Sequence, residues 1–373
     1  MRVDRTIADL VFSLKSRRSS FVQHQKSKNL MKTIYSENHK LQHGDFELVA
    51  DGLVPVFEMP RRAEIIHARV QAVNLGEILA PKDFGLTPIK RIHTAPYVEF
   101  LENAWAQWTA AGHAKHALPY TWAVRQMNQT RAPVAIEAKL GFYSLDAAAP
   151  ITPTTWQAIT SSVNVALTGA ELVKNGSSSV FSLCRPPGHH AAADYMGGYC
   201  FFNNVAVAAQ YFLDNGAARV AILDIDYHHG NGTQAIFDDR ADVLLINLHG
   251  DPSVEYPYFL GYADETGSGA GEGFNINYPM PHGTTFETWN ANLELACQNL
   301  ERYAPDVVLV SLGVDTFKHD PISQFLLETP DYLKIGARIA KLKKPTLFVM
   351  EGGYAVEEIG VNAVNVLLGF EDR

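Results

Sequence analysis

The feature that most constrains the fold is a series of short, continuously apolar segments, each followed at once by polar or charged side chains. These segments occupy residues 180–183, 220–225, 243–248, 307–312 and 346–350. Unbroken apolar runs of this length are typical of strands buried on both faces, as in a parallel sheet. Helical patterns separate them at about 204–213, 285–303, 330–341 and 355–368. The alternation predicts an α/β protein with three αβα layers, an open parallel sheet with helices on both faces.

The earlier part of the chain gives weaker signals. It predicts helices at about 60–73, 94–105 and 152–172, with a short strand near 78–79. Thr94 is expected to cap the second of these helices through its hydroxyl, with Pro96 in the first turn.

Residues 112–150 show no clear pattern. A loop of that length is usually a lid or an oligomer contact. We therefore expect one domain, residues 31–373, carrying an insertion at about 112–150. Residues 1–30 hold seven Lys or Arg and two acids, and we expect them to form a disordered N-terminal extension.

Composition excludes several classes of function. The net charge of −9 argues against broad nucleic-acid binding, which needs clustered cations to neutralise phosphates. The three cysteines, Cys184, Cys200 and Cys297, have no zinc-ribbon spacing and form no disulfide framework, which fits a reducing cytoplasm. No apolar run approaches the ~18 residues that would span a membrane.

Four of the apolar segments end in chemically useful side chains. The polar stretches that follow them are residues 184–191, 224–232, 313–321 and 351–354. Ligands of open α/β sheets bind beyond the carboxyl ends of the strands, so we expect these four stretches to build one site.

The residue types predict a metal. Asp226 and His228 are two residues apart on an extended segment and should point the same way. With Asp315 they make a three-ligand set that leaves zinc an open position for water, as catalysis requires. For Asp-x-His alone, two polar residues in a loop would be the commoner explanation.

The remaining polar residues suggest acid–base chemistry. His189 and His190 suit general acid and base roles because imidazole titrates near neutrality. Asp224 and Asn231 are candidates to orient these rings. Tyr354, after two glycines, could donate its hydroxyl to a developing oxyanion.

Each assignment has a structural alternative. Adjacent histidines often divide into one core and one surface residue, and Tyr354 could be a core aromatic. His229 is predicted to be structural, because its neighbour His228 takes the inward position.

Taken together, the motifs resemble the histone deacetylase superfamily, whose fold is shared with the arginases. They read, in chain order, RPPGHHA, GGYCFFNN, LDIDYHHGNGTQ, SLGVDTFKHDP and EGGY. The stretches IYSENHKL, IEAKLGFYS and HGDPSVEYPYFLGYADETG look most like bacterial acetylpolyamine amidohydrolases. The resemblance covers residues 31 to the end. It implies a metal-dependent amidohydrolase that cleaves acetylated polyamines of the acetylputrescine or acetylcadaverine type to acetate and free amine.

The resemblance implies the same catalytic machinery. One zinc per chain would lie on Asp226, His228 and Asp315, and the oxyanion donor would be Tyr354. The histidine pair of the family matches His189 and His190.

The resemblance also implies the substrate-binding residues. Glu47 and Glu137 match positions near the mouth of the substrate tunnel, and Tyr199 and Tyr256 match its aromatic walls. The insertion at 112–150 matches a segment that builds a homodimer and narrows the entrance.

Three positions depart from the family. Asn231 stands where many histone deacetylases have Asp, so its histidine should be more easily neutral. Asn247 stands where relatives often use Ser to help hold a structural potassium ion, which makes potassium binding less secure. Ala148 stands where one acetylpolyamine relative carries an acid, so chain-length preference could differ.

Other functions stay open at this point. A protein acetyl-lysine deacetylase would use the same chemistry. The spacing of Asp315 and Asp320 is arginase-like and would suit a two-manganese ureohydrolase. A non-catalytic acetyl-ligand binder is the alternative outside enzymes.

Overall fold

The computed structural model describes residues 30–49 and 52–372. Residues 31–373 form one compact unit. The expected extension at residues 1–30 lies outside the described residues, except for Leu30.

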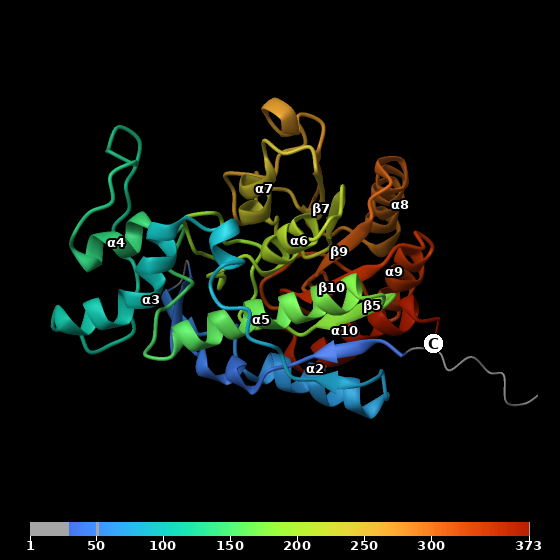
Figure 1. The fold of residues 1–373 in the computed structure, drawn as a ribbon, viewed down its shortest axis with the longest axis horizontal. Coiled ribbons are helices and arrows are strands. Elements are labelled where there is room, and N and C mark those ends of the chain that lie inside the picture. Colours follow the sequence, from blue (N-terminus) through green and yellow to red (C-terminus); the bar gives the residue numbers. More distant parts are fainter. Residues whose placement is uncertain (1–29, 50–51, 373) are drawn as a thin grey trace, which may run out of the picture. The chain divides into compact units, whose positions relative to one another are not determined.

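The core element is an eight-stranded sheet in the order β4-β1-β5-β10-β9-β6-β7-β8 (Figure 1). Its neighbouring strands run parallel, as the apolar segments predicted. The strands are β1 Lys32–Ile34, β4 Ile78–Leu79, β5 Ser179–Ser182, β6 Val220–Asp224, β7 Val243–Gly250, β8 Asn275–Met280, β9 Val307–Leu312 and β10 Thr346–Met350. Every residue of β5, β6, β9 and β10 is buried, which explains why these segments lack polar alternation.

Helices cover both faces of this sheet, as predicted. One apolar cluster joins the sheet to α3 Ala95–Ala110, α4 Ile136–Phe142, α5 Thr155–Lys174 and α6 Asn204–Asp214. A second cluster joins it to α2 Arg61–Ala72, α8 Phe286–Tyr303, α9 Asp331–Ala340 and α10 Val356–Phe370. Successive strand residues alternate between the clusters: Ile222 belongs to the first, and Ala221 and Leu223 belong to the second.

Several features differ from the sequence expectations. Thr94 stands at the start of α3, but its side chain makes no capping hydrogen bond, so the predicted hydroxyl cap was wrong. An antiparallel hairpin, β2 Phe46–Val49 and β3 Gly52–Pro55, was not predicted. Neither were β8, α7 Asn231–Phe237 nor α4, which lies within the 112–150 insertion.

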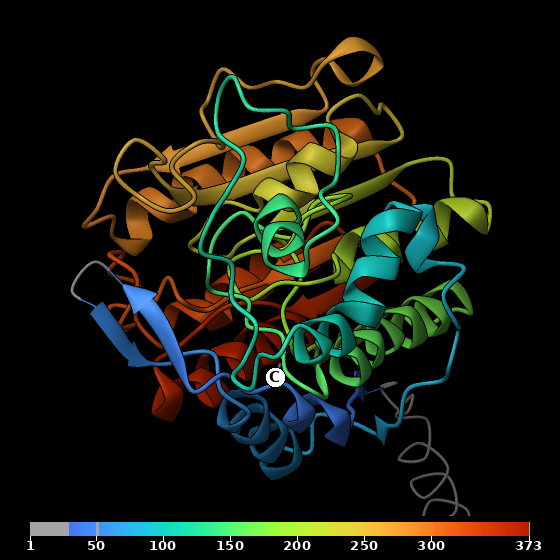
Figure 2. The ribbon, with the colours of Figure 1, turned by 90° about the vertical axis from the view of Figure 1, so that its left-hand side faces the viewer.

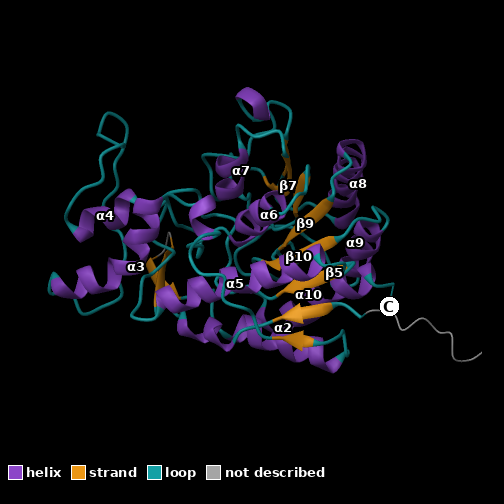
Figure 3. Cartoon of the chain, in the orientation of Figure 1, coloured by secondary structure: helices purple, strands orange, loops and turns teal. Residues whose placement is uncertain are grey.

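The carboxyl ends of the strands share one side of the molecule with α3 and α4 (Figure 3). Figure 2 views the molecule from that side, with the hairpin β2–β3 and the loop between α3 and α4 in front. None of the helices in the described ranges is long and apolar enough to cross a membrane.

Candidate active site

The sheet order places the four polar strand ends side by side. Strands β5, β10, β9 and β6 are consecutive neighbours in the sheet, and parallel strands end at the same edge. The loops that follow them therefore meet at one place beyond the carboxyl ends of the sheet.

Three side chains from two of these loops converge. Ligand atoms of Asp226, His228 and Asp315 lie within 4.8 Å of one another, and all three residues are buried. His228 Nδ1 is 3.0 Å from Asp315 Oδ2 and 3.5 Å from Asp226 Oδ1. We expected Asp226 and His228 to lie on an extended segment. Strand β6 ends at Asp224, however, and the two residues converge within a bend.

The electrostatics of this cluster favour a cation. Asp226 and Asp315 place two carboxylates together in a buried site. Burial and the neighbouring charge of Asp226 raise the pKa of Asp315 to about 6. Buried like charges are costly unless a cation compensates them. Two carboxylate oxygens and one imidazole nitrogen therefore fit a divalent metal. Zinc is one metal that binds carboxylate oxygens and imidazole nitrogens.

Glycines make this convergence sterically possible. A Cβ atom on Gly352 would lie 2.5 Å from Asp226 Oδ2 and 2.5 Å from Asp315 Oδ2. A Cβ atom on Gly313 would lie 2.0 Å from Asp226 Oδ2. The backbone N–H of Gly352 also donates to Asp226 Oδ2 at 2.7 Å. Glycine at these strand ends thus lets the carboxylates approach the backbone closely.

His190 lines the adjoining cavity with its ring oriented by Asn231. Its Nδ1 lies 2.6 Å from Asn231 Oδ1, while Asn231 Nδ2 faces the Tyr195 hydroxyl at 3.2 Å. Because an amide oxygen only accepts, His190 Nδ1 carries the hydrogen and Nε2 keeps a free lone pair. Burial, with the neighbouring His189 and His228, holds the pKa of His190 well below its usual value.

His189 stands in a different environment. Its Nδ1 lies 3.0 Å from Asp224 Oδ2, and its Nε2 lies 3.8 Å from Asp226 Oδ1. Although burial opposes the charged form, Asp226 and Asp224 raise the pKa of His189 to about 10. The structure therefore brings all four sequence-predicted acid–base residues into two separate pairs.

His229 and Asn247 lie away from the cavity. His229 is fully buried, and its Nε2 bonds Gln234 Oε1 at 2.8 Å. Asn247 Oδ1 accepts from the N–H of Gly230 at 3.3 Å. Both residues take part in the packing behind the metal ligands.

Tyr354 closes the site from the end of β10. It lines the cavity but is only 6% exposed. Burial raises its pKa well above the usual value, although the Arg62 guanidinium 4.6 Å from the ring centroid opposes that shift. Tyr354 therefore remains a hydrogen-bond donor at neutral pH.

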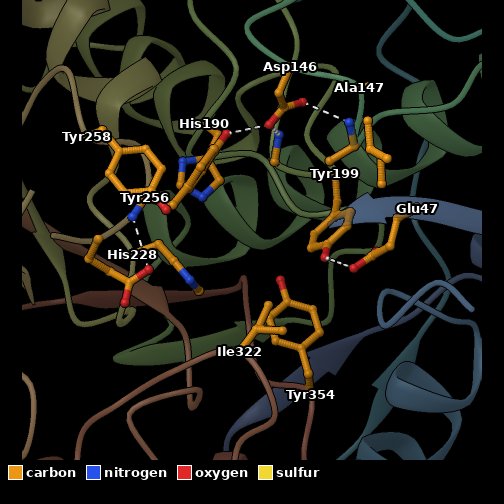
Figure 4. Close-up of a pocket in the computed structure, with 14 residues that line it drawn as sticks. Glu47, Asp146, Ala147, His190, Tyr199, His228, Tyr256, Tyr258, Ile322 and Tyr354 are labelled. Atoms are coloured by element: carbon orange, nitrogen blue, oxygen red, sulfur yellow. Dashed lines mark hydrogen bonds between the residues drawn. The ribbon is translucent and has the colours of Figure 1, made fainter. Parts of the chain in front are cut away.

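The cavity has a volume of about 590 Å³ and is aromatic and acidic (Figure 4). Tyr199 and Tyr256 form parts of its wall, and each hydroxyl bonds a carboxylate: Glu47 at 3.1 Å and Asp146 at 2.7 Å. Glu255 also lines it. None of the described residues that line the cavity is a lysine or an arginine.

Of the four residues expected to bind substrate, Glu137 is the one that does not line this cavity. Glu137 lies on α4 and bonds His113 Nε2 at 2.8 Å. It is not among the residues that line the cavity within one chain. The placement of Glu137 near the mouth of an entrance narrowed by a dimer therefore stays a prediction, and within one chain this side chain contacts its own insertion.

Several residues of the site were missed from the sequence. Arg62 donates to the carbonyls of Gly353 and Glu351, each at 2.6 Å. The Glu351 side chain accepts from the N–H of Gly188 at 2.6 Å. These partners are 291, 289 and 163 positions apart, and no local pattern signals such pairs. Asp146 lies two residues before Ala148 and lines the cavity, but no role was predicted for it from the sequence.

Comparison with known proteins places the chain among deacetylases. Residues 56–369 match the model of the histone deacetylase domain. The chain is 62% identical to acetylpolyamine amidohydrolase 2 of Pseudomonas aeruginosa, over 91% of this chain and 99% of that one. It is 49% identical to the acetylpolyamine amidohydrolase of Mycoplana ramosa, over 91% of this chain and 99% of that one.

Solved structures show the same likeness. The crystal structure of acetylpolyamine aminohydrolase from Burkholderia pseudomallei superposes with a TM-score of 0.86 at 37% identity, covering 91% of this chain and 98% of that chain. The HDA15 HD domain superposes with a TM-score of 0.75 at 25% identity, covering 92% and 90%.

Proposed function

This chain belongs to the histone deacetylase domain family, and on that basis we propose that it hydrolyses acetylated polyamines of the acetylputrescine or acetylcadaverine type. The products are acetate and the free amine. Relatives at 62%, 59% and 49% identity carry the name acetylpolyamine amidohydrolase, which supports this substrate class.

One observation carries the proposal. The cavity joins the metal-binding cluster to Glu47, Asp146 and Glu255, with no lysine or arginine among its described lining residues. Such a cavity favours a substrate with an acyl group at one end and a cationic amine at the other, because carboxylates attract ammonium groups.

We assign zinc as the metal, held by Asp226, His228 and Asp315, one ion per chain. The oxygen and nitrogen donors suit zinc and leave room for a water ligand. When bound, zinc would act as a Lewis acid toward the amide carbonyl and make water more acidic. A potassium ion beside Asp224 would have to share Asn247 Oδ1 with the Gly230 N–H.

The histidines move the protons. His190 Nε2 takes a proton from the water whose oxygen bonds to the carbonyl carbon. As the C–N bond breaks, the same nitrogen returns that proton to the leaving amine. His189, held by Asp224, supplies a second imidazole beside the reacting groups.

Tyr354 stabilises the charge that develops on the carbonyl oxygen. Its raised pKa keeps the hydroxyl protonated, so it donates a hydrogen bond when that oxygen becomes negative. Tyr199 lies beside it, with ring centroids 5.6 Å apart, and together the two rings exclude water from one side of the acetyl group.

We further propose that the enzyme acts as a homodimer through residues 112–150. Tyr120, Val124, Met127 and Val134 of this insertion are between 58% and 92% exposed, and a second copy docked on the insertion would cover such apolar side chains. In such a dimer Glu137 would serve the cavity of the second copy. The cysteines are buried and free, which supports a cytoplasmic location.

A substrate panel on zinc-reconstituted enzyme tests the proposal. The kcat/KM for acetate release should be at least roughly tenfold higher for acetylputrescine and acetylcadaverine than for acetyl-lysine peptides. A peptide would bury backbone polar groups without hydrogen-bond partners in the acidic cavity. Comparable values would favour the protein deacetylase instead. Absence of acetate release from every substrate, with binding retained, would favour the acetyl-ligand binder.

A further inference from the structure

Asp320 makes contacts that neither metal binding nor the acid–base pairs explain. Its Oδ2 accepts from the backbone N–H groups of Tyr354 at 2.6 Å and Ala355 at 3.1 Å. Its Oδ1 accepts from the N–H of Ile322 at 3.2 Å. The residue is only 7% exposed.

The contacts of Asp320 argue against the ureohydrolase function that the sequence left open. A ureohydrolase would use this carboxylate on a second metal. In the described chain, however, the metal-binding cluster contains Asp226, His228 and Asp315 without Asp320. Both Asp320 oxygens face backbone N–H groups instead. The contacts of Asp320 are therefore with the backbone and not with the metal-binding cluster.

The loop that carries Asp320 also carries the metal ligand Asp315, and it is hydrogen-bonded to the backbone of Tyr354 through Asp320. It begins at Asp315, whose carbonyl accepts from the Ser323 hydroxyl, and it contributes Ile322 to the cavity wall. Asp320 therefore fastens the backbone of Tyr354 to the loop that holds a metal ligand. This arrangement sets where the tyrosine hydroxyl lies relative to the metal.

A second charged residue holds the same segment from the other side. Arg62 donates to the carbonyl of Gly353 at 2.6 Å and lies 4.6 Å from the centre of the Tyr354 ring. Arg62 thus holds the Gly353 carbonyl and the Tyr354 ring. Asp320 holds the backbone N–H of Tyr354. Removing Asp320 would release one of these two restraints, while the Arg62 restraint and the tyrosine side chain would both remain.

We propose that Asp320 is a positioning residue for the hydrolysis, acting through the backbone of Tyr354 to aim its hydroxyl at the developing oxyanion. The inference rests on the proposed function, because it takes Tyr354 as the oxyanion donor. A shift of about 1 Å in such a group can cost about 10²-fold in rate, so the effect should appear in kcat.

The test is a double-mutant cycle with Asp320→Ala, Tyr354→Phe and the combined variant in zinc-reconstituted enzyme. Asp320→Ala should lower kcat roughly 10- to 100-fold, with KM and bound metal per chain unchanged. In the Tyr354→Phe background, the same substitution should cost less than about twofold, because residues that act as a unit are not additive. Asp320→Asn, which keeps one acceptor oxygen, should retain more activity than Asp320→Ala.

Asp331 provides a matched control. It is also 7% exposed, and its Oδ2 accepts from the N–H of Glu328 at 2.9 Å beside α9. Asp331→Ala should lower Tm as Asp320→Ala does, but leave kcat unchanged.

The outcomes separate the inference from the function beneath it. If Asp320→Ala costs the same factor with and without the Tyr354 hydroxyl, or lowers bound metal in proportion to kcat, the positioning role is overturned while the deacetylase stands. If Tyr354→Phe itself retains full activity, both the proposed mechanism and this inference fail. If Asp331→Ala lowers kcat equally, the effect of Asp320 is only one of stability.

Discussion

Adjacent residues in this site acquire opposite properties from their partners. The neighbouring histidines have a pKa of about 10 at His189 and one well below the usual value at His190. His189 faces Asp226 and Asp224, whereas His190 faces the neutral amide of Asn231. Burial and the neighbouring His189 and His228 keep the His190 imidazole neutral, with Nε2 available as a base, and the hydrogen bond to the uncharged Asn231 does not offset them.

Replacing that amide by a carboxylate should reverse the effect. In Asn231→Asp the new charge favours the imidazolium, which raises the pKa of His190 by roughly 1–3 units. The base form is then lost at higher pH, so the acidic limb of the kcat/KM profile should move upward. Superimposable profiles would contradict the assignment of His190 as base. Asn215→Asp, at the exposed end of α6, should leave the profile unchanged.

Gly352 gives a prediction about metal binding. The methyl group of Gly352→Ala would lie 2.5 Å from oxygens of Asp226 and Asp315, so it should displace both carboxylates. We expect bound zinc after dialysis to fall, with affinity reduced roughly 10- to 100-fold.

Gly176 is the control for that substitution. Its φ of +104° makes alanine strained, but nothing lies within 4 Å of the added Cβ. Gly176→Ala should therefore lower Tm and retain zinc. Equal zinc content in both variants would show that the cluster does not bind the metal.

Residue identities were predictable only where chemistry and sequence coincide. Asp226 and His228 share a motif, so their pairing was readable. Arg62 was not identified from the sequence, and the contacts of Asp320 were not predicted, because each residue acts on the Tyr354 segment through backbone groups. Backbone acceptors and donors leave no trace in side-chain patterns.

At the scale of elements, the hairpin β2–β3 contributes a carboxylate, Glu47, to the cavity wall. Its alternation is inverted: Phe46 and Leu48 are 56% and 66% exposed, while Glu47 between them is 5% exposed. Burial raises the pKa of Glu47, and a nearby ammonium would restore its ionised form. The hairpin thus presents the Glu47 carboxylate to the cavity, while Phe46 and Leu48 stay largely exposed.

Glu47→Gln should weaken recognition of the charged end of the substrate. We expect kcat/KM for acetylputrescine to fall roughly tenfold, the cost of one charged hydrogen bond, with little change for an uncharged N-acetyl alkylamine. Glu77→Gln, whose carboxylate is 62% exposed, is the control. An equal loss on both substrates would contradict ammonium binding at Glu47.

The same inversion explains why the hairpin escaped prediction. Strands were predicted from buried apolar residues. A strand with its acid buried and its apolar residues exposed does not give that signal. Strand β8 was missed for a related reason: buried Asn275 and Asn277 interrupt it, and Pro279 is typical of an edge strand. By contrast, the predicted bounds of β9 and β10 are confirmed, and all residues of both strands are buried.

At the scale of the whole molecule, strand order makes the site. The chain forms β5, β6, β9 and β10 in that sequence, but the sheet places β10 between β5 and β9. The Tyr354 loop therefore lies between the histidine loop and the loop of Asp315. The fold class was predictable from apolar alternation, whereas this order was not, because all four strands are equally apolar and pair through backbone groups alone.

The most direct test of this account is acetate release from acetylputrescine as metal-free protein is titrated with zinc. Activity should rise linearly and saturate at about one zinc per chain, because the described residues hold one cluster of three ligands that can bind the catalytic ion. Chelation should abolish activity without lowering helical circular dichroism, since neither apolar cluster contains any of the three ligands. Full activity in the metal-free protein, or saturation only at two ions per chain, would contradict the account.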